Sequence, residues 1–156
     1  MRIGVLSDTH GLLRAEALAA LRGCDHILHA GDVGDPAILE ALRKLAPVTA
    51  IRGNIDQHGS CAALPATEAV LLDGHWFYLV HSIDDLDLNP VAAGMDAVIY
   101  GHSHQPAIEW KQDVLYFNPG SAGPRRFRLP ITIGILECGS AELQPQIISL
   151  ENITQE

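Results

Sequence analysis

Residues 2–10 read RIGVLSDTH, an apolar run that ends in a polar cluster, and two later segments have the same form. These are HILHAGD at 26–32 and PVTAIRGN at 47–54. Short apolar runs predict buried strands, here Arg2–Ser7, His26–Ala30 and Pro47–Ile51. The segments between them, Leu12–Leu21 and Pro36–Leu45, have the apolar spacing of helices. We therefore expect a βαβαβ unit with parallel strands and right-handed crossovers.

The remainder of the chain is richer in strands than in helices. Asp73-Gly74 separates two apolar runs and is a strong hairpin signal. The strands predicted here are Ala69–Leu72, Trp76–Val80, Asp96–Tyr100, Ala107–Trp110, Val114–Phe117, Ile131–Cys138 and Leu143–Leu150. Leu86–Gly94 is predicted as a short helix. Because the sequence contains no linker or repeat, we expect one domain over residues 1–156, with two packed sheets and helices outside them.

The composition is that of a soluble globular protein. Of the 156 residues, 47% are hydrophobic and 19% are charged. No apolar run approaches the ~20 residues that cross a bilayer, so we expect no membrane partner. The first apolar run is too short for a signal peptide, because Ser7 and Asp8 interrupt it. We therefore expect a cytoplasmic protein. Three cysteines without CxxC spacing argue against a disulfide framework or a thiolate zinc site.

The net charge of −9 disfavours a broad electrostatic grip on nucleic acid. Nucleic acid is thus expected only as a substrate end. The charge does not exclude a phosphate substrate, because carboxylates that bind metal count as negative and bound dications reverse the local sign. The sequence carries no signal for an oligomeric state.

Metal-binding side chains recur where the predicted strands end. In chain order they are Asp8, His10, Asp32, Asn54, His81, His102 and His104. Ligands of α/β sheets gather at the carboxyl ends of strands, so these side chains are expected to converge. Imidazoles and carboxylates without thiolate suit Mn²⁺, Fe²⁺, Ni²⁺, Co²⁺ or Zn²⁺ in an open site.

The spacing within each motif supports this reading. In Asp8-Thr9-His10 and in His102-Ser103-His104, alternate residues of an extended segment point the same way and can face one ion. The carboxylate of Asp32 has enough lone pairs to bridge two cations. Each motif alone is weak, since a DxH triplet is common and an Asn after glycine is most simply a turn residue. The evidence lies in the whole series, with each member at a strand end.

This series resembles the motifs of the calcineurin-like metallophosphoesterases, and in particular their small bacterial and archaeal phosphodiesterases. The five matching motifs are Asp8-Thr9-His10, Gly31-Asp32, Gly53-Asn54, His81 and Gly101-His102-Ser103-His104. Asn118-Pro119-Gly120-Ser121 resembles the loop that follows in the small subfamily. The resemblance extends from Arg2 to about Arg126.

The resemblance implies a four-layer α/β/β/α sandwich of two mixed sheets and a two-metal phosphodiesterase acting on a small phosphate ester. The first ion would be held by Asp8, His10, Asp32 and His104. The second would be held by Asp32, Asn54, His81 and His102. Mn²⁺ is the expected metal, with Ni²⁺, Fe²⁺, Co²⁺ and Zn²⁺ as alternatives. A hydroxide between the ions would attack phosphorus, with Asp32, Asn54 and His81 in catalytic positions.

Two positions depart from the pattern of the larger relatives. Ile55 stands where many carry a histidine that assists the leaving group. Asp56 follows, and we interpret it as a partner of the metal ligands ahead of a replacement acid, since an ionised carboxylate beside a metal is a poor acid. Where the family usually has His-Gly, this sequence has His81-Ser82, so the histidine ligand is retained and only the residue after it differs.

Three more side chains have two possible readings. His29 is interpreted as a residue that hydrogen-bonds a ligand ahead of being a ligand itself. Arg125 and Arg126 could hold phosphate oxygens of a substrate, or could belong to a solvated basic turn, and the sequence favours neither.

The alternative function is a non-catalytic scaffold or protein-binding module of the same fold, as the retromer subunit with this fold illustrates. Some histidine ligands are replaced in that branch, so the complete set favours an enzyme. A metallo-β-lactamase-type hydrolase is set aside, because its HxHxDH run is absent.

Overall fold

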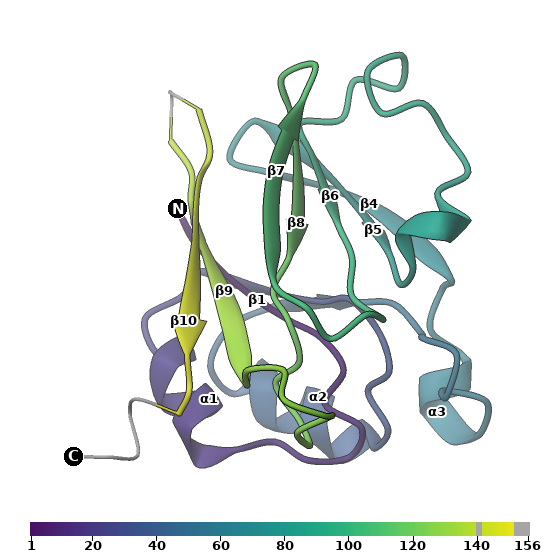
Figure 1. Cartoon of the computed structure of the whole chain (residues 1–156), viewed down its shortest axis with the longest axis vertical. Coiled ribbons are helices and arrows are strands. Elements are labelled where there is room, and N and C mark those ends of the chain that lie inside the picture. Colours follow the sequence, from purple (N-terminus) through teal and green to yellow (C-terminus); the bar gives the residue numbers. More distant parts are fainter. Residues whose placement is uncertain (140–141, 152–156) are drawn as a thin grey trace.

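Two five-stranded sheets pack face to face in the computed structural model (Figure 1), which describes residues 1–139 and 142–151. The first sheet has the order β10-β9-β1-β2-β3 and the second β4-β5-β6-β8-β7. In the first sheet the strands are β1 (Arg2–Leu6), β2 (His26–His29), β3 (Val48–Ala50), β9 (Thr132–Glu137) and β10 (Gln144–Ser149). In the second they are β4 (Thr67–Leu72), β5 (His75–Val80), β6 (Ala97–Ile99), β7 (Ala107–Lys111) and β8 (Val114–Asn118).

The parallel βαβαβ unit predicted from the opening sequence is confirmed. Strand β1 pairs in parallel with β2, and β2 pairs in parallel with β3. The connecting helices are α1 (Ala15–Leu21) and α2 (Pro36–Arg43). Helix α2 begins as its sequence predicts, with Pro36 in the first turn and the Asp35 side chain accepting a hydrogen bond from the Ala37 N–H. Figure 1 shows both helices along the first sheet.

Successive side chains of the first sheet point to opposite faces, and each face is buried in a separate hydrophobic core. One side of the first sheet packs on α1 and α2 through residues such as Leu6, Leu21 and Leu42. The other side packs against the second sheet, where Val5 and Leu28 meet Phe117 and other inward-facing residues. The predicted sandwich of two mixed sheets is therefore confirmed.

The outer face of the second sheet is covered by a loop that contains one short helix. Residues 82–96 include only the 3-10 helix η1 (Ile83–Asp85), so the helix predicted for Leu86–Gly94 is wrong. The Asn89 side chain accepts hydrogen bonds from the Val91 and Ala92 N–H groups, and it holds this segment in turns. Apolar side chains of the loop pack on the sheet and form the fourth layer: Ile83, Leu86, Leu88 and Met95.

Smaller differences concern element ends. Helix α1 starts at Ala15 and not at Leu12, because the Leu12 N–H donates to the Thr9 carbonyl oxygen and completes a turn. The short helix α3 (Gly59–Ala62) had no clear signal in the sequence. Among the residues that the structure describes, no helix combines the length and the apolar character needed to span a bilayer.

Phe117 tests the core between the sheets, since its side chain is completely buried there. We expect Phe117→Ala to lower the free energy of unfolding by about 3–5 kcal/mol, through lost burial and the cavity left behind. Urea denaturation measures this change. Trp110→Ala on the edge strand β7 is the control, because Trp110 is 45% exposed and should lose about 1 kcal/mol or less. Equal losses in the two variants would contradict the assignment of this core.

Candidate metal centre

The seven predicted ligands lie in loops that follow the carboxyl ends of strands. Asp8 and His10 follow β1, and Asp32 follows β2. His81 follows β5 directly, and Asn54 lies beyond β3. His102 and His104 follow β6. Because β1, β2 and β3 run in parallel, as do β5 and β6, their carboxyl ends bring these loops together.

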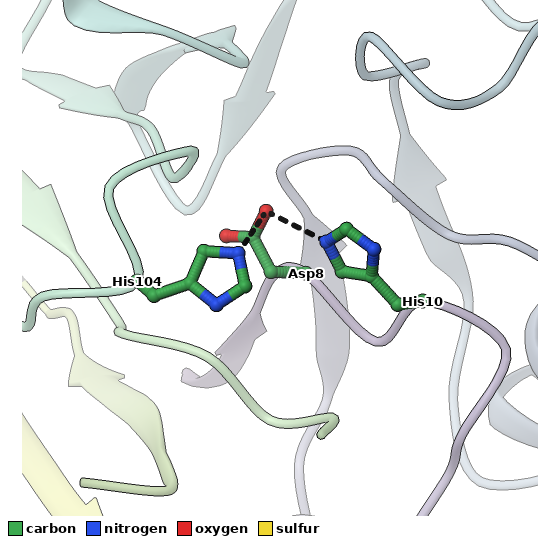
Figure 2. Close-up of side chains that lie close together, drawn as sticks. All are labelled: Asp8, His10 and His104. Carbon is green, nitrogen blue, oxygen red and sulfur yellow. Dashed lines mark ion pairs between the residues drawn. The ribbon is translucent and has the colours of Figure 1, made fainter. Parts of the chain in front are cut away.

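One half of the cluster consists of Asp8, His10 and His104, which point toward one another in Figure 2. His104 Nε2 lies 3.6 Å from Asp8 Oδ1, and His10 Nε2 lies 3.8 Å from the same oxygen. His10 Nε2 is also 3.3 Å from Asp32 Oδ2. Asp32 therefore reaches this half, as expected of a bridging carboxylate.

The other half is built around His81. Its Nε2 atom lies 3.3 Å from Asp32 Oδ2 and 3.8 Å from Asp8 Oδ1. One terminal atom of the Asn54 amide is 3.0 Å from His81 Nε2 and 3.3 Å from His102 Nδ1. The four residues expected at a second ion thus come together, with Asp32 shared between the halves.

A backbone hydrogen bond orients the His81 ring within this cluster. The Nδ1–H of His81 donates to the Ala30 carbonyl oxygen at 2.8 Å, so the neutral imidazole presents a lone pair at Nε2. Nε2 faces the carboxylate of Asp32, to which a proton on Nε2 makes a hydrogen bond when no metal is bound. In the described part of the chain, three buried atoms of the cluster have no hydrogen-bond partner: Asp8 Oδ1, His10 Nε2 and His104 Nδ1. Buried carboxylates and imidazoles gathered this closely favour a bound cation.

The titration behaviour of the cluster points the same way. Burial opposes ionisation of Asp32, but hydrogen bonds from His81 and from the Ile55 N–H outweigh it and lower the pKa of Asp32 to about 2. Burial would also lower the pKa of His81, yet the Asp32 carboxylate and the Ala30 carbonyl raise it. Burial lowers the pKa of His104, which favours the neutral form that binds metal. The cluster attracts positive charge, and its oxygen and nitrogen donors suit a mid-series dication.

The backbone of the ligands is unusual. Five of the seven have a positive φ between 47° and 71°: Asp8, His10, Asp32, His102 and His104. This left-handed conformation costs an L-residue about 1–2 kcal/mol. Residues held in it cluster at functional sites, where the surrounding structure imposes it.

The buried carboxylate of Asp56 connects two of the loops that carry the ligands. Asp56 accepts hydrogen bonds from the Val33, Gly34 and Gly53 N–H groups at 2.8–3.0 Å, so both of its oxygens bind backbone and tie the Asp32 loop to the Asn54 loop. This arrangement supports its reading as a partner of the ligand loops.

His29 has the positioning role that its sequence context favoured. Its Nδ1 accepts a hydrogen bond from the Gly31 N–H, which leaves Nε2–H to donate to the Thr9 hydroxyl. That hydroxyl donates to the Val33 carbonyl oxygen. The ring therefore connects the loops after β1 and β2 without facing an ion.

Sequence reasoning did not single out several supporting residues. Thr9 is completely buried, and it takes part in the His29 network. The Asn118 side chain donates to the Gly101 carbonyl oxygen and to Ser103 Oγ, which holds the loop of His102 and His104. Asn118 lies in the NPGS motif, so the motif was visible although the contact was not.

Two clefts adjoin the cluster. The larger, about 600 Å³, reaches Asn54, His81 and His102 and is lined also by three carboxylates: Asp84, Asp85 and Asp87. The smaller, about 270 Å³, is lined by His10, His104, Pro124, Arg125 and Arg126. The first half of the cluster thus meets a basic cleft and the second half meets an acidic one.

The two arginines of the smaller cleft differ in their surroundings. Arg125 Nη1 donates to the Leu129 carbonyl oxygen, and its guanidinium pairs with Glu151. Arg126 is exposed, and its guanidinium has no hydrogen bond or ion pair within the described residues. Arg125 therefore anchors the loop, whereas Arg126 is available to a ligand.

A two-sheet sandwich that gathers carboxylates and imidazoles at its strand ends defines a metal-binding hydrolase, and comparison with known proteins identifies the family. A family model described as the calcineurin-like phosphoesterase superfamily domain matches residues 1–141. A probable metallophosphoesterase of Methanothermobacter thermautotrophicus is 34% identical over 160 aligned residues, with 95% of this chain and 92% of the relative covered. Phosphodiesterase YfcE of Escherichia coli is 30% identical over 161, with 88% of each covered. The chain belongs to the calcineurin-like phosphoesterase superfamily and is a hydrolase of phosphate esters.

Solved structures agree on the fold. The structure of a novel archaeal phosphodiesterase superposes with a TM-score of 0.79 at 26% identity, covering 95% of this chain and all of the other. Vps29 of Entamoeba histolytica, in complex with zinc, superposes with a TM-score of 0.75 at 18% identity, covering 96% and 99%. The second likeness concerns the fold alone.

A substitution at Gly53 tests whether metal binding depends on the position of the Asp32 carboxylate. A Cβ at this position would overlap the Asp32 carboxylate, with Cγ only 2.8 Å away. We expect Gly53→Ala to displace Asp32 and to weaken Mn²⁺ binding by about 10- to 100-fold, as disturbed supporting contacts do. Calorimetric titration of metal-stripped protein measures this. Gly139→Ala is the control, since no atom of the described residues lies within 4 Å of its Cβ position. Unchanged affinity in Gly53→Ala would refute the expectation.

His29 provides a pH test. Burial lowers its pKa to about 4, from 6.5 in an unfolded chain. The unfolded state therefore binds a proton first, and stability should fall as the pH drops from 6.5 toward 4, by up to roughly 3 kcal/mol. Urea denaturation of chelator-treated protein across this range measures the slope. His29→Gln should flatten the slope by about one proton, whereas the exposed His58→Gln should keep it. Equal slopes for wild type and His29→Gln would contradict this account.

Proposed function

We propose that this chain is a dinuclear metal-dependent phosphodiesterase. The observation that carries the proposal is the set of seven ligands, whose oxygen and nitrogen donor atoms converge in one cluster, three of its buried atoms having no hydrogen-bond partner in the described chain. The first ion would take Asp8, His10, Asp32 and His104, and the second Asp32, Asn54, His81 and His102. The distances from Asp32 Oδ2 to His10 Nε2 and to His81 Nε2, both 3.3 Å, support its role as the shared ligand.

Two bound dications would activate water near neutral pH and offset the charge that develops on the phosphoryl oxygens. The chain's own residues position this chemistry. The His102 N–H donates to Asp8 Oδ2 at 3.1 Å and leaves Oδ1 free for an ion. The Ala30 carbonyl oxygen keeps the proton of His81 on Nδ1, so that Nε2 remains a ligand. The Ile55 N–H fixes Asp32 through Oδ1.

Mn²⁺ is the metal we propose, with Ni²⁺, Fe²⁺, Co²⁺ and Zn²⁺ as alternatives. The set holds carboxylate, imidazole and amide donors, which this series shares. Availability and site geometry decide among these ions more than affinity does.

A diester is the proposed substrate class, because the chain lacks an evident acid for a poor leaving group. Ile55 is 41% exposed at the position where larger relatives carry a histidine. Asp56 is held by three backbone N–H groups and is not directed at the cluster. The relatives named phosphodiesterases support the same class. Arg126 is proposed to contact the substrate phosphate, and Arg125 to shape its loop.

A scaffold of the same fold is the competing function, and the likeness to Vps29 keeps it in view. The complete ligand set favours the enzyme, since a scaffold has no need for buried carboxylates and imidazoles gathered this closely. The two functions differ in turnover, which the following experiment measures.

Purified protein loaded with Mn²⁺ should hydrolyse bis(p-nitrophenyl) phosphate and bind two Mn²⁺ per chain. Asp32→Asn removes the negative charge of the shared ligand. Loss of a residue that only supports a metal ligand costs up to about 100-fold in activity, so we expect the loss of this ligand to lower turnover by well over a hundredfold. Release of p-nitrophenol measures turnover, and elemental analysis measures the metal.

Asp113→Asn is the matched control. Asp113 also has a positive φ, but it lies in the turn between β7 and β8, away from the cluster. This variant should keep wild-type turnover. Absence of turnover in the wild type with every one of Mn²⁺, Fe²⁺, Co²⁺, Ni²⁺ and Zn²⁺ would overturn the enzymatic proposal in favour of the scaffold.

A further inference from the structure

The loop at 123–129 forms one wall of the smaller cleft and is held by the rest of the chain. Arg14 Nε donates to the Gly123 carbonyl oxygen at 3.2 Å at its start. Arg125 bonds to the Leu129 carbonyl oxygen and pairs with Glu151 at its end. Between these anchors, Arg126 lines the cleft beside the ligands His10 and His104. The loop thus has a fixed shape next to the cluster.

Phe127 stands at the tip of this loop with its ring in solvent. It is 87% exposed, more than any other large apolar side chain of the described chain. The Leu129 N–H donates to the Arg126 carbonyl oxygen, so Phe127 is the first central residue of a tight turn. Its φ of 54° is a value for which this turn position favours Gly, Asn or Asp. Neither folding nor turn formation accounts for an aromatic side chain there.

The other positive φ angles have local explanations. Five belong to proposed metal ligands, and three belong to hairpin turns: Asp73, Gln112 and Asp113. Phe127 is the remaining non-glycine residue with this conformation among those described. Strained backbone beside a functional site leads to a hypothesis of function.

The charge around Phe127 is opposite to that of the whole protein. The chain has a net charge of −9, yet three of its ten basic side chains are Arg125, Arg126 and Arg128. The larger cleft, by contrast, carries three carboxylates, Asp84, Asp85 and Asp87, against one guanidinium, that of Arg52. An anionic part of a substrate is therefore attracted toward the loop and repelled from the larger cleft.

We propose that this loop recognises a nucleotide, with a base stacked on Phe127 and a phosphate held by Arg126. Exposed aromatic rings combined with arginines bind single-stranded nucleotides through stacking and charge. A guanidinium without a partner can also make paired hydrogen bonds to phosphate oxygens. The inference rests on the proposed function and specifies its substrate class as nucleotidyl phosphodiesters.

Two chromogenic diesters test the proposal, because they differ only in the group that stays on phosphorus. Thymidine 5′-(p-nitrophenyl phosphate) carries a nucleoside, and methyl p-nitrophenyl phosphate carries a methyl group. In both, water replaces p-nitrophenol at phosphorus, so the bond broken is the same. The Mn²⁺-loaded protein should prefer the nucleotide in kcat/KM.

Phe127→Ala should lower kcat/KM for the nucleotide by about tenfold or more and leave the methyl ester unchanged. Phe127→Trp, which keeps an aromatic face, should retain the preference. Trp110→Ala removes another exposed aromatic ring and should change neither substrate. Equal effects of Phe127→Ala on both substrates, or none on either, would overturn the proposal.

Arg126→Gln should lower kcat/KM for the nucleotide several-fold, with exposed Arg22→Gln as its control. Competitive inhibition of nucleotide hydrolysis then shows whether the loop binds a single-stranded nucleic acid or a small nucleotide. Stronger inhibition by a single-stranded thymidine octanucleotide than by thymidylyl-thymidine assigns a strand, and equal inhibition assigns the smaller ligand. Inhibition by neither would overturn the proposal.

A binding measurement separates this inference from the proposed function. Thymidine 3′,5′-bisphosphate, titrated calorimetrically, should bind wild type about tenfold or more tightly than Phe127→Ala, whether or not turnover occurs. If neither diester is hydrolysed, the phosphodiesterase proposal fails while this titration still decides the role of the loop. Identical affinities would overturn the nucleotide site.

Discussion

The crowding of two buried carboxylates with several imidazoles is the constraint on which this structure depends. The carboxylates of Asp8 and Asp32 lie within 4 Å of imidazole nitrogens, and the Nδ1 proton of His81 is directed away from them. Desolvation and charge repulsion oppose such a cluster in a chain without metal. The remaining structure must therefore hold these groups in place, and a bound cation would convert their repulsion into attraction.

The sandwich supplies this support from the core outward. Fully buried residues such as Val5, Leu28 and Phe117 lock the sheets together, which fixes the positions of the strand ends. Hydrogen bonds then connect neighbouring loops, with Thr9 and His29 on one side and Asn118 on another. The left-handed backbone of the ligands is the local cost of aiming them at one point.

Much of this organisation could be predicted from the sequence, because strands and ligands share one signal. A short apolar run predicts a strand, and the polar residue that follows it predicts a metal ligand, as Val5 and Asp8 illustrate. The helix predictions were wrong where side-chain or turn hydrogen bonds hold the backbone in turns despite a helical spacing of apolar residues. Asn89 holds its segment in turns instead of a helix, and the turn at Leu12 delays α1.

Side-chain contacts between distant segments could not be predicted in the same way. The contact of Asn118 with Ser103 depends on the order of strands in the second sheet, which the residue pattern did not specify. The exposure of Phe127 was equally hidden, since an apolar residue near a turn is expected to be buried when only its type is known.

The triple hydrogen bond of Asp56 has a mechanical consequence. Its carboxylate joins Val33 and Gly34, which follow Asp32, to Gly53, which precedes Asn54. A displacement of Asn54 away from His81 must therefore drag the loop of Asp32 with it. Since Asp32 is shared by both halves of the cluster, ordering the Asn54 loop also orders the carboxylate that the other half uses. In the proposed two-metal site, binding of one ion is therefore expected to favour binding of the second.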